Sequence, residues 1–424
     1  MLSVTPTPEL FPRYIAARLR EAIDSFRVVV VNGPRQAGKS TLLRALAPAN
    51  CPVLTLDDRD QLRAARTDPA GFVAAYSRPT FIDEVQRGGN SLILAIKAEV
   101  DRHHTESGLF VLAGSSRFLT VPQLSESLAG RVRLAELLPL SQGELTGTGS
   151  RPHFLTSLMA DPDAIRSLDA PRLNRPEAME RVIIGGFPAV HRLSSARLRS
   201  DWFDSYVETL VQRDLLELSR IRQSTDLPRL LRLLAARSAQ ELNLAKLARH
   251  AGLGEDATRA YLALLETIYL HYSLPAWSTN ETSRAKRRPK LHFVDTGVAA
   301  NLLGATVDQL AIPTAPLAGP LLESFVASEL RKSAAWSEER VVFNHYRDAE
   351  KREVDLVVEA RDGRVGAIEV KAARDVDESD FRHLRYLRDR LGDRFVNGVV
   401  VHLGERPLSF GDRLTALPLA AIWA

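Results

Sequence analysis

The segment Gly33 to Ser40 constrains this chain more than any other stretch, because GPRQAGKS matches the pattern G-x-x-x-x-G-K-[ST] of a phosphate-binding loop. Four consecutive valines precede the loop and a helical pattern follows it, which is the strand, loop and helix context that the motif requires. Gly33 and Gly38 allow the backbone to curl so that successive N–H groups and the helix N-terminus point at an anion. The segment therefore predicts a nucleotide-binding α/β domain.

The residues of this loop have separate expected tasks. Lys39 is expected to reach the β- and γ-phosphates, and Ser40 to be the protein ligand of Mg²⁺, with Thr41 as the alternative ligand. The residues expected to hold the nucleotide are Gly33, Pro34, Arg35, Gln36, Ala37, Gly38, Lys39, Ser40 and Thr41.

A second motif, Phe81-Ile82-Asp83-Glu84, places two acids at the end of an apolar run. Asp83 is expected to hold the metal through water, and Glu84 to polarise the attacking water as a general base. This pair indicates a nucleotide hydrolase that carries its own catalytic glutamate. By contrast, we interpret Asp57-Asp58, after another apolar run, as a helix cap in preference to a catalytic pair.

Three further polar residues are candidates for the same site. Ser115 follows the apolar run Leu109 to Ala113 and is expected to orient the lytic water, with an ordinary Gly-Ser turn as the alternative. Arg131 is a candidate γ-phosphate contact or arginine finger, and the alternative is an arginine exposed to solvent with no role at the site. Arg213, beside Asp214, could reach a nucleotide in a neighbouring subunit, although an exposed ion pair is the preferred interpretation.

The length and composition of the chain bound its class. With 424 residues, the chain is longer than one hydrophobic core usually supports, so its length predicts two or three domains. A formal net charge of +4 permits a nucleic-acid partner without requiring one. Cys51 is the sole cysteine, which excludes an intrachain disulfide and favours a reducing compartment. The N-terminus lacks an apolar signal core and no apolar run reaches spanning length, so we expect a cytoplasmic protein with no membrane partner.

The middle of the chain, 227–274, shows the helix and turn pattern of a winged-helix module. Its expected recognition helix, Glu255 to Leu265, offers only Arg259 as a basic side chain, which is poor phosphate-binding chemistry. DNA recognition by this module is therefore the weakest hypothesis. A basic cluster follows in the next loop, and we prefer a solvated loop to a phosphate contact for it; it consists of Arg284, Lys286, Arg287, Arg288 and Lys290.

A second chemical pattern lies near the C-terminus, where Asp355 on one predicted strand is followed by Glu369-Val-Lys371 on the next. Strand alternation puts Glu369 and Lys371 on one face, while Asp355 approaches from the paired strand. Asp355 and Glu369 would coordinate Mg²⁺ and Lys371 would activate water against a phosphodiester, as in restriction-endonuclease-like nucleases. Glu323 is the expected additional acid and metal ligand, with Glu329 as the alternative. A charged hairpin with an exposed lysine, or a nuclease fold without activity, remains open.

An ordered set of motifs over nearly the whole chain resembles a known family: bacterial and archaeal AAA-type ATPases that join an ATP-binding domain to a C-terminal domain of unknown function similar to restriction-endonuclease-like nucleases. The resemblance implies binding of ATP and its hydrolysis with Mg²⁺. Ala37 is its one local departure. The motifs are GPRQAGKST (33–41), FIDEVQ (81–86), LAGSSRFL (112–119), ESLAGR (126–131), LLPLSQGEL (137–145), GGFP (185–188), YVETLVQRDL (206–215), KLHFVDTGVAANLLG (290–304), GPLLESFVASEL (319–330), and EVDLVVE followed by AIEVKAA.

These observations predict an α/β fold with a parallel-sheet P-loop domain over 1–147, a helical linker region over 148–225, a winged-helix-like module over 226–275 and a mixed α/β restriction-endonuclease-like domain over 276–424. The expected function is Mg²⁺-dependent ATP hydrolysis whose cycle controls the C-terminal domain, acting on DNA. The alternative is an ATP-dependent switch whose C-terminal domain binds a protein partner without cleavage. Because AAA-type sites often take an arginine from a neighbour, an oligomer remains open.

Overall fold

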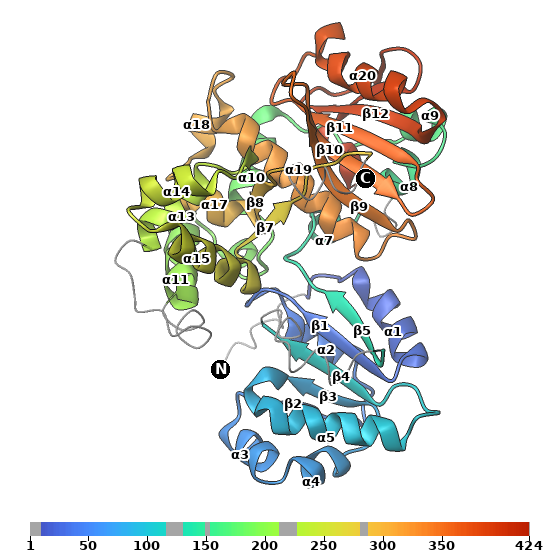
Figure 1. The fold of residues 1–424 in the computed structure, drawn as a ribbon, viewed down its shortest axis with the longest axis vertical. Coiled ribbons are helices and arrows are strands. Elements are labelled where there is room, and N and C mark those ends of the chain that lie inside the picture. The colour runs from blue at the N-terminus through green and yellow to red at the C-terminus, as the bar shows by residue number, and fades with distance from the viewer. Residues whose placement is uncertain (1–9, 116–129, 149–152, 212–226, 280–286, 424) are drawn as a thin grey trace, which may run out of the picture.

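The structure is a computed structural model that describes residues 10–115, 130–148, 153–211, 227–279 and 287–423. It contains a parallel five-stranded sheet domain, a helical middle region and a C-terminal domain with a mixed sheet. Figure 1 shows the N-terminal sheet domain at the bottom, with the other two parts side by side above it. The predicted α/β class and the order of its parts are confirmed.

The N-terminal sheet has the strand order β2-β3-β4-β1-β5, and all of its pairings are parallel. Parallel strands end at the same edge of a sheet, so the segments that follow β1, β3 and β4 meet there. β4 lies between β1 and β3, as the expected role of Ser115 requires. The strands are β1 (Val28–Asn32), β2 (Val53–Thr55), β3 (Thr80–Asp83), β4 (Phe110–Gly114) and β5 (Val132–Glu136).

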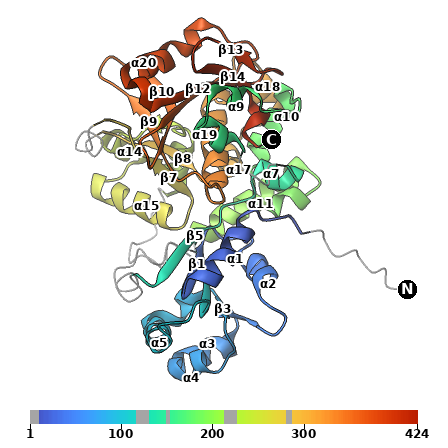
Figure 2. The same cartoon turned by 90° about the vertical axis from the view of Figure 1, so that its right-hand side faces the viewer.

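Helices cover both faces of this sheet, each over its own apolar core. α1 (Ile15–Ser25) and α2 (Lys39–Leu46) pack on one face, while α3 (Arg59–Thr67), α4 (Pro69–Ala74) and α5 (Gly89–Arg102) pack on the other (Figure 2). A 3₁₀ turn, η1 (Val85–Gly88), follows β3. The Asp58 side chain accepts hydrogen bonds from two N–H groups in the first turn of α3, which confirms the helix cap expected there.

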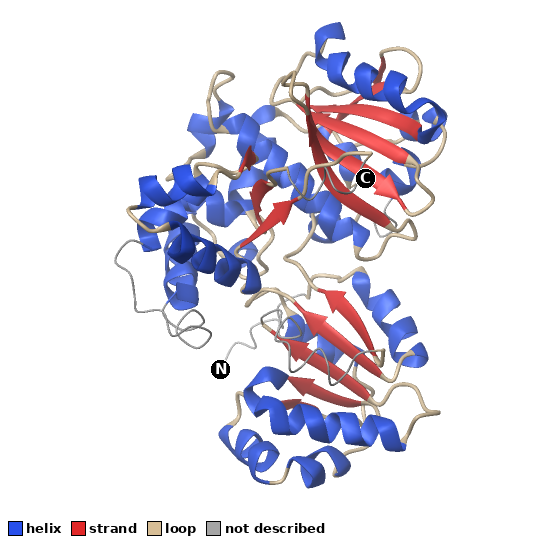
Figure 3. Cartoon of the chain, in the orientation of Figure 1, coloured by secondary structure: helices blue, strands red, loops and turns tan. Residues whose placement is uncertain are grey.

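The middle region is largely helical within the described residues (Figure 3). Its early helices are α7 (Gln142–Thr146), α8 (His153–Leu158), α9 (Pro162–Arg166), α10 (Arg175–Ile184) and α11 (Ala196–Thr209), with η3 (Val190–Arg192) before α11. The candidate Arg213 lies outside the described residues. The later helices are α13 (Leu227–Ala235), α14 (Leu244–Ala251), α15 (Glu255–Thr267), α17 (Thr296–Leu302) and α18 (Val307–Ala311).

A small antiparallel sheet accompanies the later helices, in the order β6-β8-β7. Its strands are β6 (Gln240–Glu241), β7 (His271–Leu274) and β8 (Lys290–Phe293). The domain boundary expected at 275/276 therefore falls inside this sheet, because β8 returns to pair with both earlier strands.

The C-terminal domain has a six-stranded mixed sheet in the order β13-β14-β12-β11-β10-β9. The expected hairpin is present, since β10 and β11 pair antiparallel with Leu356 opposite Ile368. Around the sheet lie α19 (Ala318–Ala334), α20 (Arg382–Leu391) and the 3₁₀ turns η5 (Glu378–Phe381), η6 (Gly392–Arg394) and η7 (Leu419–Ile422). The strands are β9 (Val341–Arg347), β10 (Glu353–Ala360), β11 (Val365–Val370), β12 (Phe395–His402), β13 (Leu408–Ser409) and β14 (Leu414–Pro418).

The middle region and the C-terminal domain share one apolar core. Leu230 of α13, Phe325 of α19 and Val399 of β12 belong to the same buried cluster, whereas the two faces of the N-terminal sheet have clusters of their own. By its cores, the molecule therefore consists of two bodies, the N-terminal sheet domain and the joined remainder. None of the described helices combines the length and apolar composition needed to cross a lipid bilayer.

Candidate functional site

The phosphate-binding loop connects β1 to α2, and α2 begins at Lys39. Gln36 and Gly38 have φ values of +63° and +95°, which turn the backbone sharply. The buried Lys39 Nζ donates hydrogen bonds to the carbonyl oxygens of Gly33 (2.9 Å) and Pro34 (2.8 Å), so its ammonium lies inside the loop. A Cβ on Gly33 would lie 2.0 Å from the carbonyl oxygen of Leu137, so this close approach requires glycine.

Two buried acids end β3 beside the loop. Glu84 has a φ of +52°, an uncommon conformation for a residue with a side chain, and its N–H donates to Asp83 Oδ1 (3.0 Å). Ser115 Oγ donates to Glu84 Oε2 (3.0 Å), so the structure brings these two expected residues together. Gln86 Nε2 donates to the same carboxylate oxygen and to Ser115 Oγ (3.3 Å). Sequence reasoning missed Gln86, although FIDEVQ includes it.

The loop faces a cavity of about 620 Å³ between the N-terminal domain and the middle region. Glu84, Asp57 and the loop residues from Arg35 to Thr41 line one side. The rest of the wall comes from the segment before α1, the segment before α7 and the middle region. These residues are Leu10, Phe11, Arg13, Leu140, Pro188, Ala189, Arg192, Trp202, Ser205, Tyr206, Thr209 and Leu210. The expected site is therefore a cleft with walls from both bodies of the molecule.

The GGFP turn that follows α10 builds part of the middle-region wall. Gly186 N–H donates to Asp295 Oδ2 (2.7 Å), and its carbonyl accepts from Leu140 N–H (2.7 Å). A Cβ on Gly185 would lie 2.1 Å from Asp295 Oδ1, and one on Gly186 would lie 2.2 Å from the Leu140 carbonyl oxygen. The two glycines let the turn pack tightly enough to set Pro188 at the cavity, a role that the motif alone did not reveal.

The same wall holds an aromatic group on α11. The rings of Trp202 and Tyr206 stack at 5.0 Å with an angle of 8°, and Phe187 packs against both. Tyr206 Oη donates to the carbonyl oxygen of Arg35 at 3.4 Å, which joins α11 directly to the phosphate-binding loop. The middle region therefore contacts the loop as well as facing it.

Arg131 does not reach this cavity, which corrects the expectation of a γ-phosphate contact within the same chain. It precedes β5, whose register sets Val132 beside Val28 and Glu136 beside Asn32. Arg131 thus lies at the opposite edge of the sheet, about 16 Å along the strand from the loop edge. Its Nε pairs with Asp101 Oδ1 at 2.7 Å.

Other arginines line the cavity that Arg131 does not reach. Arg13, Arg35 and Arg192 line the cavity. Arg13 forms an ion pair with Glu144 and donates hydrogen bonds to the carbonyl oxygens of Ala37 and Leu138, at 2.7 Å each. It therefore holds the loop at Ala37. Sequence reasoning found Arg35 as part of the loop and missed Arg192, which becomes a candidate only once η3 folds against the cavity.

The residues present fit ATP and Mg²⁺. Gln36 and Gly38 have positive φ values, and both line the cavity together with Lys39 and Ser40. Asp83 and Glu84 lie at the adjacent strand end, where a hydroxyl and a carboxylate suit Mg²⁺. These are the kinds of group that P-loop domains use to hold a nucleotide and its metal.

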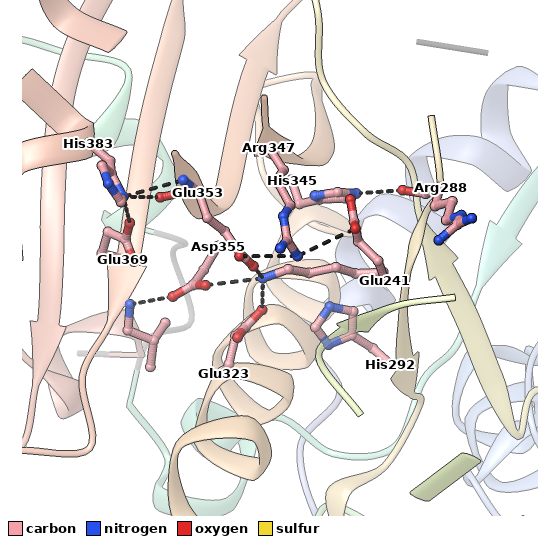
Figure 4. A network of polar contacts seen from close by, with 12 residues as sticks. Glu241, Arg288, His292, Glu323, His345, Arg347, Glu353, Asp355, Glu369 and His383 are labelled. Atoms are coloured by element: carbon pink, nitrogen blue, oxygen red, sulfur yellow. Dashed lines mark hydrogen bonds and ion pairs between the residues drawn. The ribbon is translucent and has the colours of Figure 1, made fainter. Parts of the chain in front are cut away.

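The acids predicted in the C-terminal domain also come together, but around an ammonium group. Lys290 Nζ, on β8, lies 2.7 Å from Glu323 Oε1, 2.8 Å from Glu353 Oε1 and 3.1 Å from Asp355 Oδ1. The dashed lines from these three acids converge in Figure 4. Asp355 Oδ2 accepts the N–H of Val370 on β11 (3.0 Å). Sequence reasoning assigned Lys290 to a solvated loop and so missed it.

The charges of this cluster are mutually dependent. Burial lowers the pKa of Lys290, but Asp355, Glu323 and Glu353 outweigh this and raise the pKa well above its usual value. Burial, followed by the charge of Asp355, raises the pKa of Glu369 well above normal. The pKa of Asp355 is lowered, because Lys290 and the Val370 N–H outweigh its burial. Asp355 and Glu369 share a hydrogen bond, and their pKa values are shifted in opposite directions.

Lys371 lies close enough to Glu369 for its charge to act on that carboxylate, and of the two acids considered on α19 it is Glu323, not Glu329, that lies in this cluster. Lys371 Nζ pairs with Asp380 Oδ1 at 3.5 Å and is 37% exposed. Glu329 bonds to Lys332 Nζ (2.8 Å) and to Gln142 N–H (2.7 Å), at the junction with α7. Within the described residues, no group of three or more His, Cys, Asp or Glu side chains could hold a metal ion. Glu323, Asp355 and Glu369 thus do not fit the predicted metal site.

The comparisons with known proteins identify three segments. Residues 25–146 match the model described as "AAA domain", 175–309 match "Domain of unknown function (DUF8612)" and 318–422 match "Domain of unknown function (DUF4143)". Two relatives, "Uncharacterized protein Rv2008c" of Mycobacterium tuberculosis and "Uncharacterized protein Mb2031c" of Mycobacterium bovis, are each 30% identical over 408 residues, covering 96% of this chain and 83% of theirs.

Solved structures with partial similarity include ATPases. A Walker-type ATPase of Pyrococcus abyssi has a TM-score of 0.44 and 15% identity, over 69% of this chain and 96% of that one. AMPPCP-bound DnaA of Aquifex aeolicus has a TM-score of 0.28 and 12% identity, over 59% and 86% of the two chains.

Proposed function

From the premise that this chain belongs to the family of the mycobacterial proteins Rv2008c and Mb2031c and contains an AAA-type ATPase domain, we propose that it is an Mg²⁺-dependent ATPase acting as a molecular switch. ATP would bind in the cavity between the two bodies, and its hydrolysis would change how they pack. The observation that carries the proposal is the bonded pair of Glu84 and Ser115 beside the phosphate-binding loop.

Each residue of the cavity has a task in this proposal. Lys39 would leave its loop carbonyls to neutralise phosphate oxygens. Ser40 would hold Mg²⁺ directly and Asp83 would hold it through water, and the ion would neutralise phosphate charge. Glu84 accepts the proton of the attacking water, and Ser115 fixes the orientation of that carboxylate through a 3.0 Å hydrogen bond. Gln86 supports the same oxygen from its other side.

The switch part of the proposal rests on the shared walls of the cavity. Pro188, Arg192 and Trp202 from the middle region face the loop, and Tyr206 bonds to it. The two bodies can pack in more than one arrangement, and a ligand that contacts both walls binds these arrangements with different affinities. It therefore shifts the equilibrium toward the arrangement that it binds more tightly. Nucleotide state would therefore bias the position of the joined middle and C-terminal body.

A protein partner suits this switch better than DNA. The outer face of α15 exposes Glu255, Asp256 and Arg259, which gives it no positive charge in excess. The order α13, β6, α14, α15, β7, β8 supports interpretation as a winged-helix-like module, but the loop after β7 is docked: Trp277 is buried in the core of the C-terminal sheet, and its Nε1 donates to Glu359. We propose a module with a structural role.

The test is ATP turnover by the purified chain, with and without duplex and single-stranded DNA. We expect Lys39→Ala to lose nucleotide binding, and Glu84→Gln to keep binding but lose at least about 10²-fold in turnover. Glu106→Gln, which changes an exposed acid of the same domain, is the matched control and should behave like the wild type. Absence of turnover with intact ATP binding would contradict hydrolysis, and stimulation by DNA would contradict the preference for a protein partner.

A second candidate function is metal-dependent DNA cleavage by the C-terminal domain. It is favoured by the hairpin that sets Asp355 beside Glu369, as in a restriction-endonuclease-like site. The position of Lys290 among the acids and the ion pair of Lys371 with Asp380 weigh against it. Incubation of plasmid DNA with Mg²⁺ or Mn²⁺ tests this candidate: cleavage that Lys371→Ala abolishes while ATP turnover persists would support it, and no cleavage is the result we expect.

A further inference from the structure

Lys290 belongs to a different part of the chain from the acids that surround it. It lies on β8, paired with β6 and β7 of the middle sheet, whereas Glu323 lies on α19 and Glu353 and Asp355 lie on β10. The matched family domains divide the chain between the same two groups, since 175–309 contains the lysine and 318–422 contains the acids. The cluster is therefore a contact between two parts of the chain.

The geometry suits an ammonium group. Three carboxylate oxygens lie within 3.1 Å of Nζ: it donates hydrogen bonds to Glu323 and Asp355, and it forms an ion pair with Glu353 at 2.8 Å. The lysine is 1% exposed, which means that water cannot replace any of these partners. A divalent ion needs oxygens at roughly 2.0 to 2.6 Å and a coordination number of six or more, and the ammonium already fills the space between the acids.

Further bonds cross the same contact. Arg347 of β9 lies 3.4 Å from Glu241 of β6 and 3.6 Å from Glu353 (Figure 4). His345 Nε2 bonds to the carbonyl oxygen of Arg288 at 3.0 Å, directly before β8. Trp277 N–H donates to the carbonyl oxygen of His345 at 2.6 Å. Lys290 is thus the buried centre of an extended joint.

We propose that Lys290 is the resident cation of the C-terminal acidic cluster: it takes the position of a metal ion and fastens the middle region to the C-terminal sheet. The cluster then serves as a joint and has no metal-dependent chemistry. The middle region and the C-terminal domain move together, so any nucleotide-driven motion takes place between them and the N-terminal domain. This inference stands independently of ATP hydrolysis, because the joint contains no residue of the nucleotide cavity.

The first test measures thermal unfolding of Lys290→Met, which keeps the length of the side chain and removes its charge. We expect the melting temperature to fall by several degrees, because the buried Asp355 and the partly buried Glu323 and Glu353 lose their counter-charge. Adding Glu323→Gln and Asp355→Asn to the same chain should recover part of the loss, since the uncompensated charge is removed. Lys246→Met, at an exposed lysine of α14, is the matched control and should unfold like the wild type.

A Lys290→Met chain as stable as the wild type would overturn the fastening role, and so would a triple variant that is no more stable than the single one. The second test needs no lysine variant. Mn²⁺ binding, followed by electron paramagnetic resonance without nucleotide, is compared between the wild type and Asp355→Asn. We expect equal binding; tighter binding by the wild type would show a metal at Asp355 and overturn the proposal.

Discussion

In the proposed mechanism, hydrolysis depends most directly on Glu84, whose backbone has a φ of +52° and whose carboxylate is held by Ser115 and Gln86. Uncommon backbone conformations persist where the surroundings fix them, and they cluster at functional sites. The orientation of this acid is therefore set before a nucleotide arrives. Its neighbours should influence the rate of hydrolysis more than the affinity for ATP.

We predict that Ser115→Ala lowers kcat roughly tenfold and leaves KM for ATP nearly unchanged, because the lost hydrogen bond orients Glu84 and does not touch the nucleotide. Steady-state turnover measures both constants. Ser167→Ala, at an exposed serine after α9, is the matched control. An increase in KM with unchanged kcat would instead mean that Ser115 contacts the nucleotide.

A second prediction concerns two buried histidines beside Lys290. Burial, with the charge of Lys290, lowers the pKa of His292 to about 3 and that of His345 to about 4. Both rings are neutral in the folded chain and take up a proton near pH 6.5 when the chain unfolds. The unfolded state therefore binds more protons between about pH 6.5 and pH 4, and stability falls as the pH falls through this window.

The loss should approach about 1.4 kcal/mol per pH unit for each histidine. Urea unfolding at pH 7, 6 and 5 measures it, and His292→Gln should show a shallower slope than the wild type whatever its stability at pH 7. Asp355, Glu353 and Arg347 also lie near these rings, so the comparison of slopes isolates the histidine contribution. Equal slopes would contradict the prediction.

At the scale of elements, the turn η3 and helix α11 add a second wall to the P-loop edge and so make it a cleft. We predict that Arg192→Ala raises KM for ATP roughly tenfold, because one charge-assisted hydrogen bond to a phosphate is worth about 1.5 kcal/mol or more. Arg197→Ala, on α11 and 79% exposed, is the matched control and should leave KM unchanged. An unchanged KM for both variants would mean that η3 does not contact the nucleotide.

Elements whose function depends on their own strand and turn were predictable from sequence. The loop from Gly33 to Ser40, the acids that end β3, and the hairpin of β10 and β11 all occupy the places that local pattern gave them. Ser115 was predictable because β4 had to lie between β1 and β3. To predict these residues, it is enough to know the alternation of side chains along a strand, the position where each strand ends and the strand order of the sheet.

Residues whose surroundings come from distant elements were not predictable. Lys290 belongs to a stretch rich in basic residues, and only the pairing of β8 turns its side chain into the acids of β10 and α19. Arg131 is close to other motifs in sequence, but the parallel register of β5 sends it to the far edge of the sheet. The role of Gly186 depends on a contact with Leu140, which no spacing reveals.

At the scale of the whole molecule, the two bodies meet at the nucleotide cavity and along α19. Arg331 near the end of α19 bonds to Glu136 of β5 at 2.6 Å and lies over the ring of Tyr272. Arg18 of α1 donates to the carbonyl oxygen of Trp336 just beyond the helix. α19 therefore touches the N-terminal domain at one end and, through Glu323, supports the joint toward the other.

We predict that ATP added to Glu84→Gln protects amides in 33–41, 185–192 and 202–210 against hydrogen exchange, because both cavity walls are ordered together. The C-terminal sheet, 353–370, should exchange at an unchanged rate, since it moves with the middle region as one body. Lys39→Ala with ATP is the control that should show no protection. Protection of the loop alone would mean that the middle region does not enclose the nucleotide.

The lysine on β8 also limits how this protein can be rearranged. A C-terminal half transplanted onto another chain would carry the clustered acids Glu323, Glu353 and Asp355 and leave their cation behind, so it would need a new counter-charge. During evolution, replacement of Lys290 would be tolerated best together with replacement of one of the acids that surround it. The two halves are therefore expected to be exchanged between proteins as a pair, with the boundary for recombination on the N-terminal side of the middle region.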